Sequence, residues 1–249
     1  MYKSLKISKN NLERILKPVN KMAESCVLKT DSSGIFTICS SADNTVILYA
    51  RMKVDSIDTQ ERINVINIKR LLTGLQCLDD DNFLLEKCEN NIKCSSESSD
   101  GDKTHFKYHL VDDSVIRESV FNIKKIASLD FDSEFVIPAN KIRQIMSGYA
   151  FTSDTQKIYF YSNEQQEVFA DINDATNQNI DNITFKVSAD LKGNHIKDAT
   201  PINIEIFKNL AGCRNDIKVK INNQFKVFVF QNNDDDNVEL KYIVSALVK

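Results

Sequence analysis

The sequence contains no tryptophan, only three prolines and only six glycines among its 249 residues. So little glycine and proline excludes collagen-like and linker-rich proteins. The glycines stand too far apart for a phosphate-binding loop or a dinucleotide fingerprint. No run approaches the roughly 18 apolar residues of a membrane-spanning helix. Since the first ten residues also lack the apolar region of a secretory signal, we expect an intracellular protein that does not bind membranes.

The sequence contains enough apolar residues to build a hydrophobic core. Hydrophobic residues make up 42% and charged residues 27%, and the net charge is -3. This length suits one large domain or two of about 125 residues. Six cysteines are scattered without a Cys-x-x-Cys pair, which indicates reduced thiols in an intracellular protein.

Most of the chain has the alternating pattern of β-strands. Residues 26–53 alternate apolar and polar positions between turn signals at 31–34 and 42–44, and residues 225–248 resemble a hairpin with its loop at 232–237. Further strands are predicted at 103–110, 131–137, 157–162, 166–172 and 182–191. The polar runs at 79–81, 95–102 and 234–236 are predicted to be loops.

Four short segments have helical periodicity instead. The first, 9–22, follows Ser8 as a possible N-cap, and Pro18 is expected to kink or shorten it. The second, 67–78, starts with Asn67 as its cap. The third, 138–149, opens on a proline. The fourth, 202–213, has a weaker pattern that a strand could also explain.

These segments give a repeated order of strand, helix and several strands, four times over. A repeat of about 60 residues indicates a duplicated supersecondary unit. The longest insert, 111–130, lies midway along the chain. We therefore predict an α+β fold with an N-terminal domain at 1–110, a connector at 111–130 and a similar C-terminal domain at 131–249.

Basic residues are concentrated in the helical segments. These segments hold ten basic residues against two acidic ones, although the whole chain is acidic. A solvated helix face alone could explain one such segment, but four together favour a basic layer facing a polyanion, with contacts to phosphates that read no base sequence. The predicted DNA-binding residues are Lys9, Arg14, Lys17, Lys21, Lys69, Arg70, Lys141, Arg143, Lys208 and Arg214.

The sequence offers no convincing catalytic or metal-binding pattern. Nucleophile-elbow and zinc-protease motifs are absent. His105 and His109 would share one face of a strand, but no further ligands stand at a suitable spacing, so two surface histidines are the better interpretation. We expect a protein that is not an enzyme and that uses no cofactor or metal.

The order of these segments resembles that of DNA sliding clamps, both the clamp of T4-type phages and the proliferating cell nuclear antigen. The resemblance spans nearly the whole chain and rests on the order and spacing of four stretches, 66–94, 106–146, 179–191 and 240–244. It implies two domains, each with two βαβββ units and with helices on one face of antiparallel sheets. Three subunits would close into a ring lined by the helices.

The resemblance also implies two further sets of residues. The last strand of the first domain would pair with an edge strand of the next subunit, unless both strands lie inside one sheet; the interface residues are Phe106, Tyr108, Leu110, Ile183, Phe185 and Val187. A pocket beneath the connector would bind a partner peptide through Val46, Val115, Ile116, Val120 and Ile243, unless these residues serve ordinary packing.

The function implied is that of a processivity factor. A homotrimer would encircle double-stranded DNA, tether a DNA polymerase and contact a clamp loader, and a phage origin is suggested by the resemblance alone. Two alternatives stay open: a β-rich viral or bacterial structural protein without a DNA role, and a monomeric clamp-like accessory subunit of a polymerase.

Overall fold

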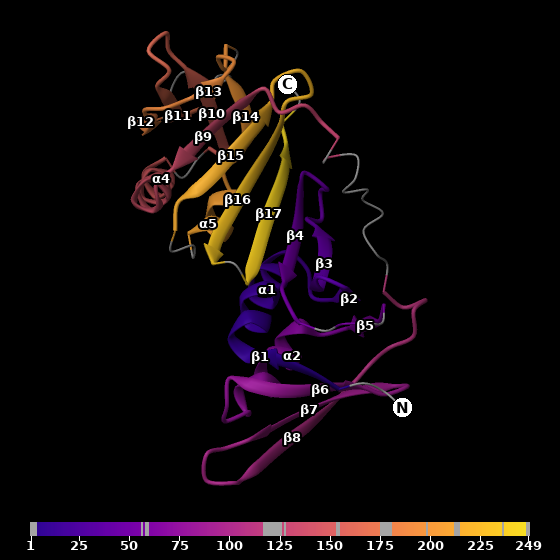
Figure 1. Cartoon of the computed structure of the whole chain (residues 1–249). Helices are drawn as coiled ribbons and strands as arrows, with labels where there is room; N and C mark the ends of the chain where they lie inside the picture. Colours follow the sequence, from indigo (N-terminus) through magenta and orange to yellow (C-terminus); the bar gives the residue numbers. More distant parts are fainter. Residues whose placement is uncertain are drawn as a thin grey trace. The chain divides into compact units, whose positions relative to one another are not determined.

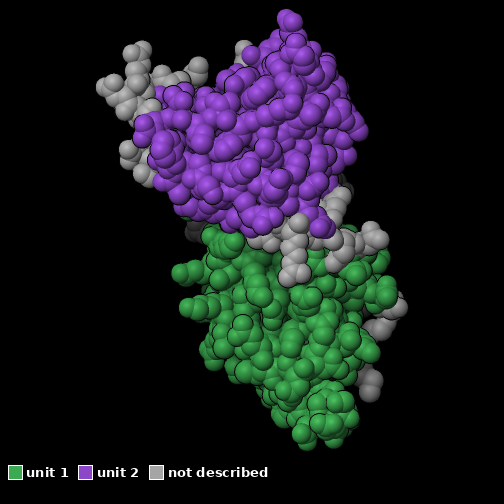
Figure 2. All heavy atoms as spheres, turned by 90° about the vertical axis from the view of Figure 1, so that its left-hand side faces the viewer, with its two compact units in different colours: residues 1–42, 48–121, 235–240 green, residues 43–47, 122–234, 241–249 purple. Residues whose placement is uncertain are grey.

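The protein was analysed as a computed structural model, which describes residues 4–55, 57, 60–116, 126, 128–152, 155–174, 181–197, 199–211, 215–235 and 237–247. The chain divides into two compact units, and each is described by itself (Figure 2). Unit 1 consists of residues 1–42, 48–121 and 235–240, and unit 2 of residues 43–47, 122–234 and 241–249. The predicted boundaries at 110 and 131 stay a prediction, since much of the connector lies outside the described residues.

Among the described residues, unit 1 contains two helices and strands β1 to β8 (Figure 1). Its helices are α1 (Lys9–Met22) and α2 (Ile68–Gln76), which lie against one another. Its strands are β1 (Ser4–Ser8), β2 (Cys26–Asp31), β3 (Gly34–Ser40), β4 (Val46–Met52, of which the first two residues count to unit 2), β5 (Arg62–Val65), β6 (Asn82–Lys87), β7 (Asn91–Glu97) and β8 (Lys103–His109).

The strands of unit 1 form two antiparallel arrays around a buried apolar core. One array has the order β1-β6-β7-β8 and the other the order β4-β3-β2-β5. Helix α1 contacts β1 and β3, one strand from each array, and α2 contacts β8. The helices thus cover the apolar faces of the strands, and fully buried side chains such as Leu12, Leu28 and Phe83 fill the interior.

Unit 2 has the same kinds of element. Its helices are α4 (Ala139–Phe151) and α5 (Ile206–Leu210), which also lie against one another. Its strands are β9 (Ser133–Ile137), β10 (Lys157–Ser162), β11 (Val168–Ile172), β12 (Ile183–Ser188), β13 (Lys192–Gly193), β14 (Thr200–Asn203), β15 (Ile217–Asn222), β16 (Val227–Asp235) and β17 (Val238–Ser245, shared with unit 1). They are arranged in the orders β12-β11-β10-β14 and β13-β9-β15-β16-β17.

The core of unit 2 contains a cluster of aromatic rings. Phe160 of β10 is in the centre, with its ring centroid 5.7 Å from that of Phe228 and 6.3 Å from that of Phe207. Phe135 and Phe230 complete the cluster. Tilted and stacked ring pairs at these distances add to the free energy of burial. They fasten the short helix α5 to strands from both arrays.

The predicted fold class is confirmed, and the helices begin close to where they were expected. The Ser8 hydroxyl and the Asn67 side chain cap α1 and α2 as predicted, accepting hydrogen bonds from the backbone N–H groups of Asn11 and Arg70. Pro18 does not shorten α1, which continues to Met22, because the side chains on both sides of the proline are anchored in the core. The fourth segment is mixed, with strand β14 followed by the single-turn helix α5.

The loop predictions were partly wrong. Strand β7 continues through Glu97 into the serine-rich run, because Ser96 and Glu97 pair with Thr104 and Lys103 of β8. Strand β16 continues to Asp235 and so shortens the predicted hairpin loop. The segment 79–81 is irregular, as expected. None of the helices in the described ranges has both the length and the apolar character needed to cross a membrane.

Candidate nucleic-acid interface

Helix α1 places its apolar and basic residues on different faces. Leu12, Ile15, Leu16 and Val19 are buried, whereas Lys17 and Lys21 are exposed and Arg14 is half-buried. The Lys17 ammonium forms an ion pair with Glu13 at 2.6 Å, one helical turn earlier. Such an exposed pair is weak and can open when a phosphate competes for the lysine. Lys9 contributes less, because its ammonium donates a 2.7 Å hydrogen bond to the carbonyl of Leu78.

The basic residues of α2 are in its first turn. Lys69 and Arg70 directly follow the cap, are exposed and form no ion pair within the part of the chain that the structure describes. Cations at a helix N-terminus oppose the helix dipole, and this turn contains no acidic residue to compensate. The arrangement costs stability but concentrates positive potential, as expected of a surface that attracts an anion.

Unit 2 has fewer cations available on its helices. On α4, Arg143 is exposed and Lys141 is half-buried, and neither forms an ion pair among the described residues. On α5, Lys208 forms an ion pair with Glu205 at 2.5 Å and lies 5.3 Å from the centre of the Tyr149 ring. The pairing with Glu205 raises the pKa of Lys208. Arg214 lies outside the described residues.

The two strands expected to meet between subunits are both edge strands. Strand β8 pairs only with β7 and is the last strand of its array, and β12 pairs only with β11 and is the last strand of another. The alternative that both lie inside one sheet is therefore wrong. Each edge presents backbone groups without partners in the sheet, which can bind a further strand.

Which groups of β8 face outward follows from its register. The N–H of Leu110 donates to the carbonyl of Asn90 at 2.9 Å, so Leu110 faces β7. Antiparallel pairs alternate, and the register from 97↔103 to 91↔109 is unbroken. The backbone groups of Lys103, His105, Lys107 and His109 therefore point away from β7, toward the open edge.

An aromatic side chain lies over a helical glycine at each edge. A Cβ atom on Gly74 of α2 would lie 2.9 Å from the Phe106 ring, and one on Gly148 of α4 would lie 2.7 Å from the Phe185 ring. The glycines let the edge strands approach their helices. Our sequence prediction missed these glycines, although the signal was present: glycine inside a helix costs about 1 kcal/mol, so two of only six glycines in predicted helices point to close packing.

The predicted interface residues fall into a half-buried group and a buried group. Ile183 is half-buried, as are Phe106, Phe185 and Leu110, so these four can contact another chain. Tyr108 is 5% exposed and Val187 is 1% exposed. The Tyr108 hydroxyl accepts from the N–H of Asn67 at 2.9 Å and donates to its carbonyl at 3.1 Å. The side chains at these two positions are therefore not available to another chain.

Comparisons with known proteins locate this fold. No protein-family description and no curated protein matches the sequence. Among solved structures, the proliferating cell nuclear antigen of Entamoeba histolytica is 15% identical with a TM-score of 0.74, covering 98% of both chains. That of A. fulgidus, bound to the C-terminal region of FEN-1, is 15% identical with a TM-score of 0.75, covering 100% of this chain and 99% of the other. That of Thermococcus kodakaraensis is 14% identical with a TM-score of 0.75, covering 98% and 99%.

The fold is that of a sliding clamp. The likeness covers the whole chain rather than one unit, so both units have their place in the clamp fold. At this level of identity it assigns the fold and leaves the chemistry to the residues of this chain.

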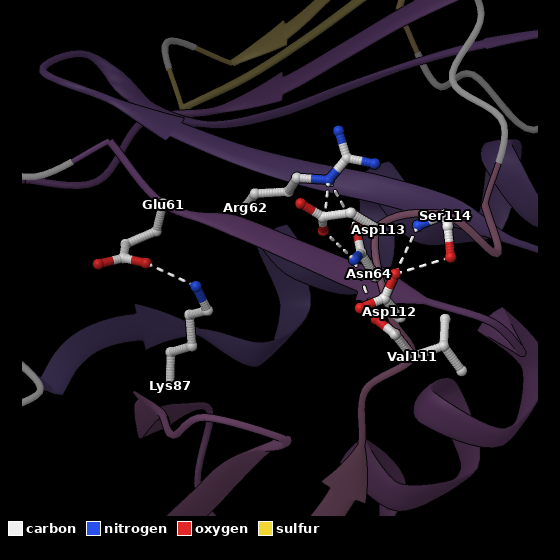
Figure 3. A network of polar contacts seen from close by, with 8 residues as sticks. All are labelled: Glu61, Arg62, Asn64, Lys87, Val111, Asp112, Asp113 and Ser114. Atoms are coloured by element: carbon white, nitrogen blue, oxygen red, sulfur yellow. Dashed lines mark hydrogen bonds and ion pairs between the residues drawn. The ribbon is translucent and has the colours of Figure 1, made fainter.

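Residues 111–114, at the start of the predicted connector, are held to strand β5 by a polar network (Figure 3). The Asn64 amide donates to the carbonyl of Val111 at 3.0 Å and to the carboxylate of Asp113 at 2.6 Å, and Arg62 lies 3.0 Å from the same carboxylate. Asp112 accepts from the backbone and hydroxyl of Ser114, which lowers the pKa of Asp112. Residues 111–113 are thus tied to β5 by side-chain contacts within unit 1.

The predicted peptide pocket stays a prediction. Val46 and Ile243 are buried and belong to unit 2, and Val115 and Ile116 belong to unit 1. Ile116 is buried, and Val115 is 57% exposed. Val120 lies outside the described residues.

Within the described residues no three histidine, cysteine or acidic side chains gather as metal ligands. His105 and His109 are exposed on β8, and the described cysteines are free thiols. Burial raises the pKa of Cys26, Cys39 and Cys94 to about 12, so these three thiols stay protonated at neutral pH.

Proposed function

We propose that the chain is a sliding clamp: three copies close into a ring around double-stranded DNA and hold a DNA polymerase on its template. The observation that carries the proposal is the whole-length likeness to proliferating cell nuclear antigens. The two free sheet edges support it, because head-to-tail pairing of β8 with β12 of the next copy would satisfy both. The exposed cations on α1, α2 and α4 support contact with DNA.

The proposed mechanism requires only weak binding between the ring and DNA. A closed ring leaves DNA only when an interface opens, so the basic helices need only keep the duplex centred. Contacts to phosphates through lysine and arginine are independent of base sequence and weaken with salt, and both properties permit sliding. No catalytic step is assigned to this chain. A clamp loader is proposed as a second partner, and the nearer relationship to T4-type phage clamps rests on sequence resemblance.

The test is the absolute mass in solution, measured by light scattering over a range of concentrations. The ring predicts a species of about 85 kDa, three times the 28.4 kDa of one chain, that dissociates on dilution. A 28.4 kDa monomer at every concentration would contradict the self-closing ring. It would favour the monomeric accessory subunit, which differs from the structural protein by salt-dependent binding to duplex DNA.

A further inference from the structure

The two edge strands β8 and β12 are packed against their helices in the same way. The Phe106 ring of β8 lies against Gly74 of α2, and the Phe185 ring of β12 lies against Gly148 of α4. Helix α2 contacts β8, and helix α4 contacts β12. An aromatic ring over a helical glycine thus recurs at two strands that each have only one partner strand in the sheet.

The backbone does not require glycine at either position. Gly74 and Gly148 lie inside their helices, and neither has a positive φ. Alanine stabilises the interior of a helix more than glycine does. At these two positions the chain therefore gives up helix stability, and what it gains is space.

That space is occupied by the outer end of each ring. A Cβ atom on Gly74 would lie 2.9 Å from Cε2 and 3.1 Å from Cζ of Phe106. A Cβ atom on Gly148 would lie 2.7 Å from Cζ of Phe185 and 3.1 Å from Cγ2 of Ile183. Carbon atoms in contact lie about 3.5–4.0 Å apart, so an alanine at either position would push the ring away from the helix.

Each ring can move in only one direction. Phe106 stands opposite Cys94 of β7, and Phe185 stands opposite Ala170 of β11. Cys94 and Ala170 are fully buried, whereas both rings are half-buried. The helix and the neighbouring strand thus enclose two sides of each ring, and its exposed side faces the open edge of the sheet.

We propose that Gly74 and Gly148 are positioning residues of the subunit interface, which keep the two rings close to their helices so that a strand of the next copy can approach each edge. The inference rests on the proposed ring and adds two determinants of its assembly. When β8 pairs with β12 of the next copy, side chains on the helix side of both strands become neighbours. A ring displaced by an alanine would occupy the place of the neighbour's side chain.

The proposal predicts opposite effects on folding and on assembly for Gly74→Ala. In the single chain the Phe106 ring can turn outward into water, and the helix gains from alanine, so stability should not fall. In the assembled ring the neighbouring strand fills that space, and overpacking a filled interface is unfavourable. A glycine that served folding alone would change stability and leave assembly unaffected.

The experiment measures the mass of the full chain by light scattering over a dilution series. For Gly74→Ala and Gly148→Ala, the concentration at which half of the trimer has dissociated should rise about tenfold or more. Urea unfolding of Gly74→Ala, at a concentration where the chain is monomeric, should give a midpoint no lower than that of the wild type. Gln76→Ala and Gln144→Ala are matched controls at exposed positions of the same helices and should assemble like the wild type.

A double-mutant cycle tests whether the effect passes through the ring. Leucine lacks the Cε2 and Cζ atoms that a Cβ atom on Gly74 would meet first. Gly74→Ala should therefore weaken assembly less than about twofold when it is introduced into Phe106→Leu. The same cycle with Gly148→Ala and Phe185→Leu repeats the test at the other edge.

The outcomes separate this inference from the proposed function. Alanine variants that assemble as well as a trimeric wild type would overturn the inference and leave the clamp proposal standing. An equal loss of assembly with phenylalanine and with leucine at position 106 would overturn it as well. A wild type that is monomeric at every concentration would contradict the clamp proposal itself, together with the inference that rests on it.

Discussion

At the scale of single residues, Gly34 allows strand β3 to approach the backbone of Met52 in strand β4 closely. Its φ is +140°, and a Cβ atom would lie 2.0 Å from the carbonyl oxygen of Met52. We expect Gly34→Ala to lower the free energy of unfolding by about 2–3 kcal/mol, since it combines backbone strain with a steric clash. The measurement is urea unfolding followed by circular dichroism.

Gly101→Ala is the matched control for this change. Gly101 also has a positive φ, +86°, but nothing lies within 4 Å of a Cβ atom there. Substitution of Gly101 should lower the free energy of unfolding by about 1 kcal/mol, which is the contribution of backbone strain alone. Equal losses at the two positions would show that the contact with Met52 is unimportant.

The Asp31 carboxyl makes the stability of the folded protein depend on pH. Its partial burial would raise its pKa, but the Ser33 hydroxyl and N–H donate to the carboxylate and Arg51 lies 2.6 Å away, so its pKa is lowered overall. Arg51 in turn lies 5.1 Å from the centre of the Phe36 ring. A lowered pKa in the folded state stabilises the protein above the unfolded pKa, and this contribution is lost as pH falls through the folded value.

We therefore expect Asp31→Asn to cost about 1 kcal/mol at pH 7 and at pH 5, and the difference from the wild type to shrink below about pH 3.8 and to vanish only below the lowered pKa of the folded state. Urea unfolding at several pH values measures it. Asp55→Asn is the control, because Asp55 is exposed and has no hydrogen bond or ion pair in the described structure. A constant difference at every pH would contradict the electrostatic explanation.

At the scale of elements, the open edge of β8 can be tested by its hydrogen bonds. The Lys107 N–H points away from β7, so Lys107→Pro removes a donor from the edge without breaking the ladder to β7. If β8 pairs with another copy, the trimer dissociation constant should rise at least tenfold. Lys107→Ala removes the same charge but keeps the N–H, and should stay trimeric by light scattering. An unchanged mass for Lys107→Pro would exclude β8 as the pairing edge.

The helices and strands also differ in how well they could be predicted from the sequence. The helices α1 and α2 were predictable because their periodicity and caps agree. Strand β15 was missed although Ile217, Val219 and Ile221 alternate with lysines, and the short strands β5 and β14 had too few residues to show a period. Both edge strands were predicted from their alternating pattern, and only their place at a subunit interface came from the resemblance. A polar pocket lined by Asp132, Gly193 and Asn223 could not be predicted, because these residues meet only in the folded chain.

At the scale of the whole molecule, the proposed contact with DNA would depend on where the positive charge lies. Reversing Lys17, Lys21, Lys69 and Arg143 to Glu should lower duplex affinity at least tenfold at about 100 mM salt and should flatten the slope of log affinity against log salt. Filter binding over a salt series measures both. A DNA polymerase assayed with this variant should synthesise shorter products than with the wild type.

A second variant with the same net charge separates position from total charge. Lys6, Lys53, Lys93 and Lys192 are exposed lysines outside the helices. Their reversal to Glu should leave most of the affinity and the salt slope intact. Equal losses in the two variants would show that DNA responds to overall charge and not to the helical surface.

The edge strand β8 has a further consequence during synthesis in the cell. An unpaired strand is a template for aggregation, and every new copy of the chain exposes one. The outward positions of β8 include Lys103 and Lys107, and like charges facing each other disfavour the pairing of two β8 edges. The lysines that keep two copies of β8 apart in nascent chains would, in the proposed ring, leave this edge open to a strand of different sequence.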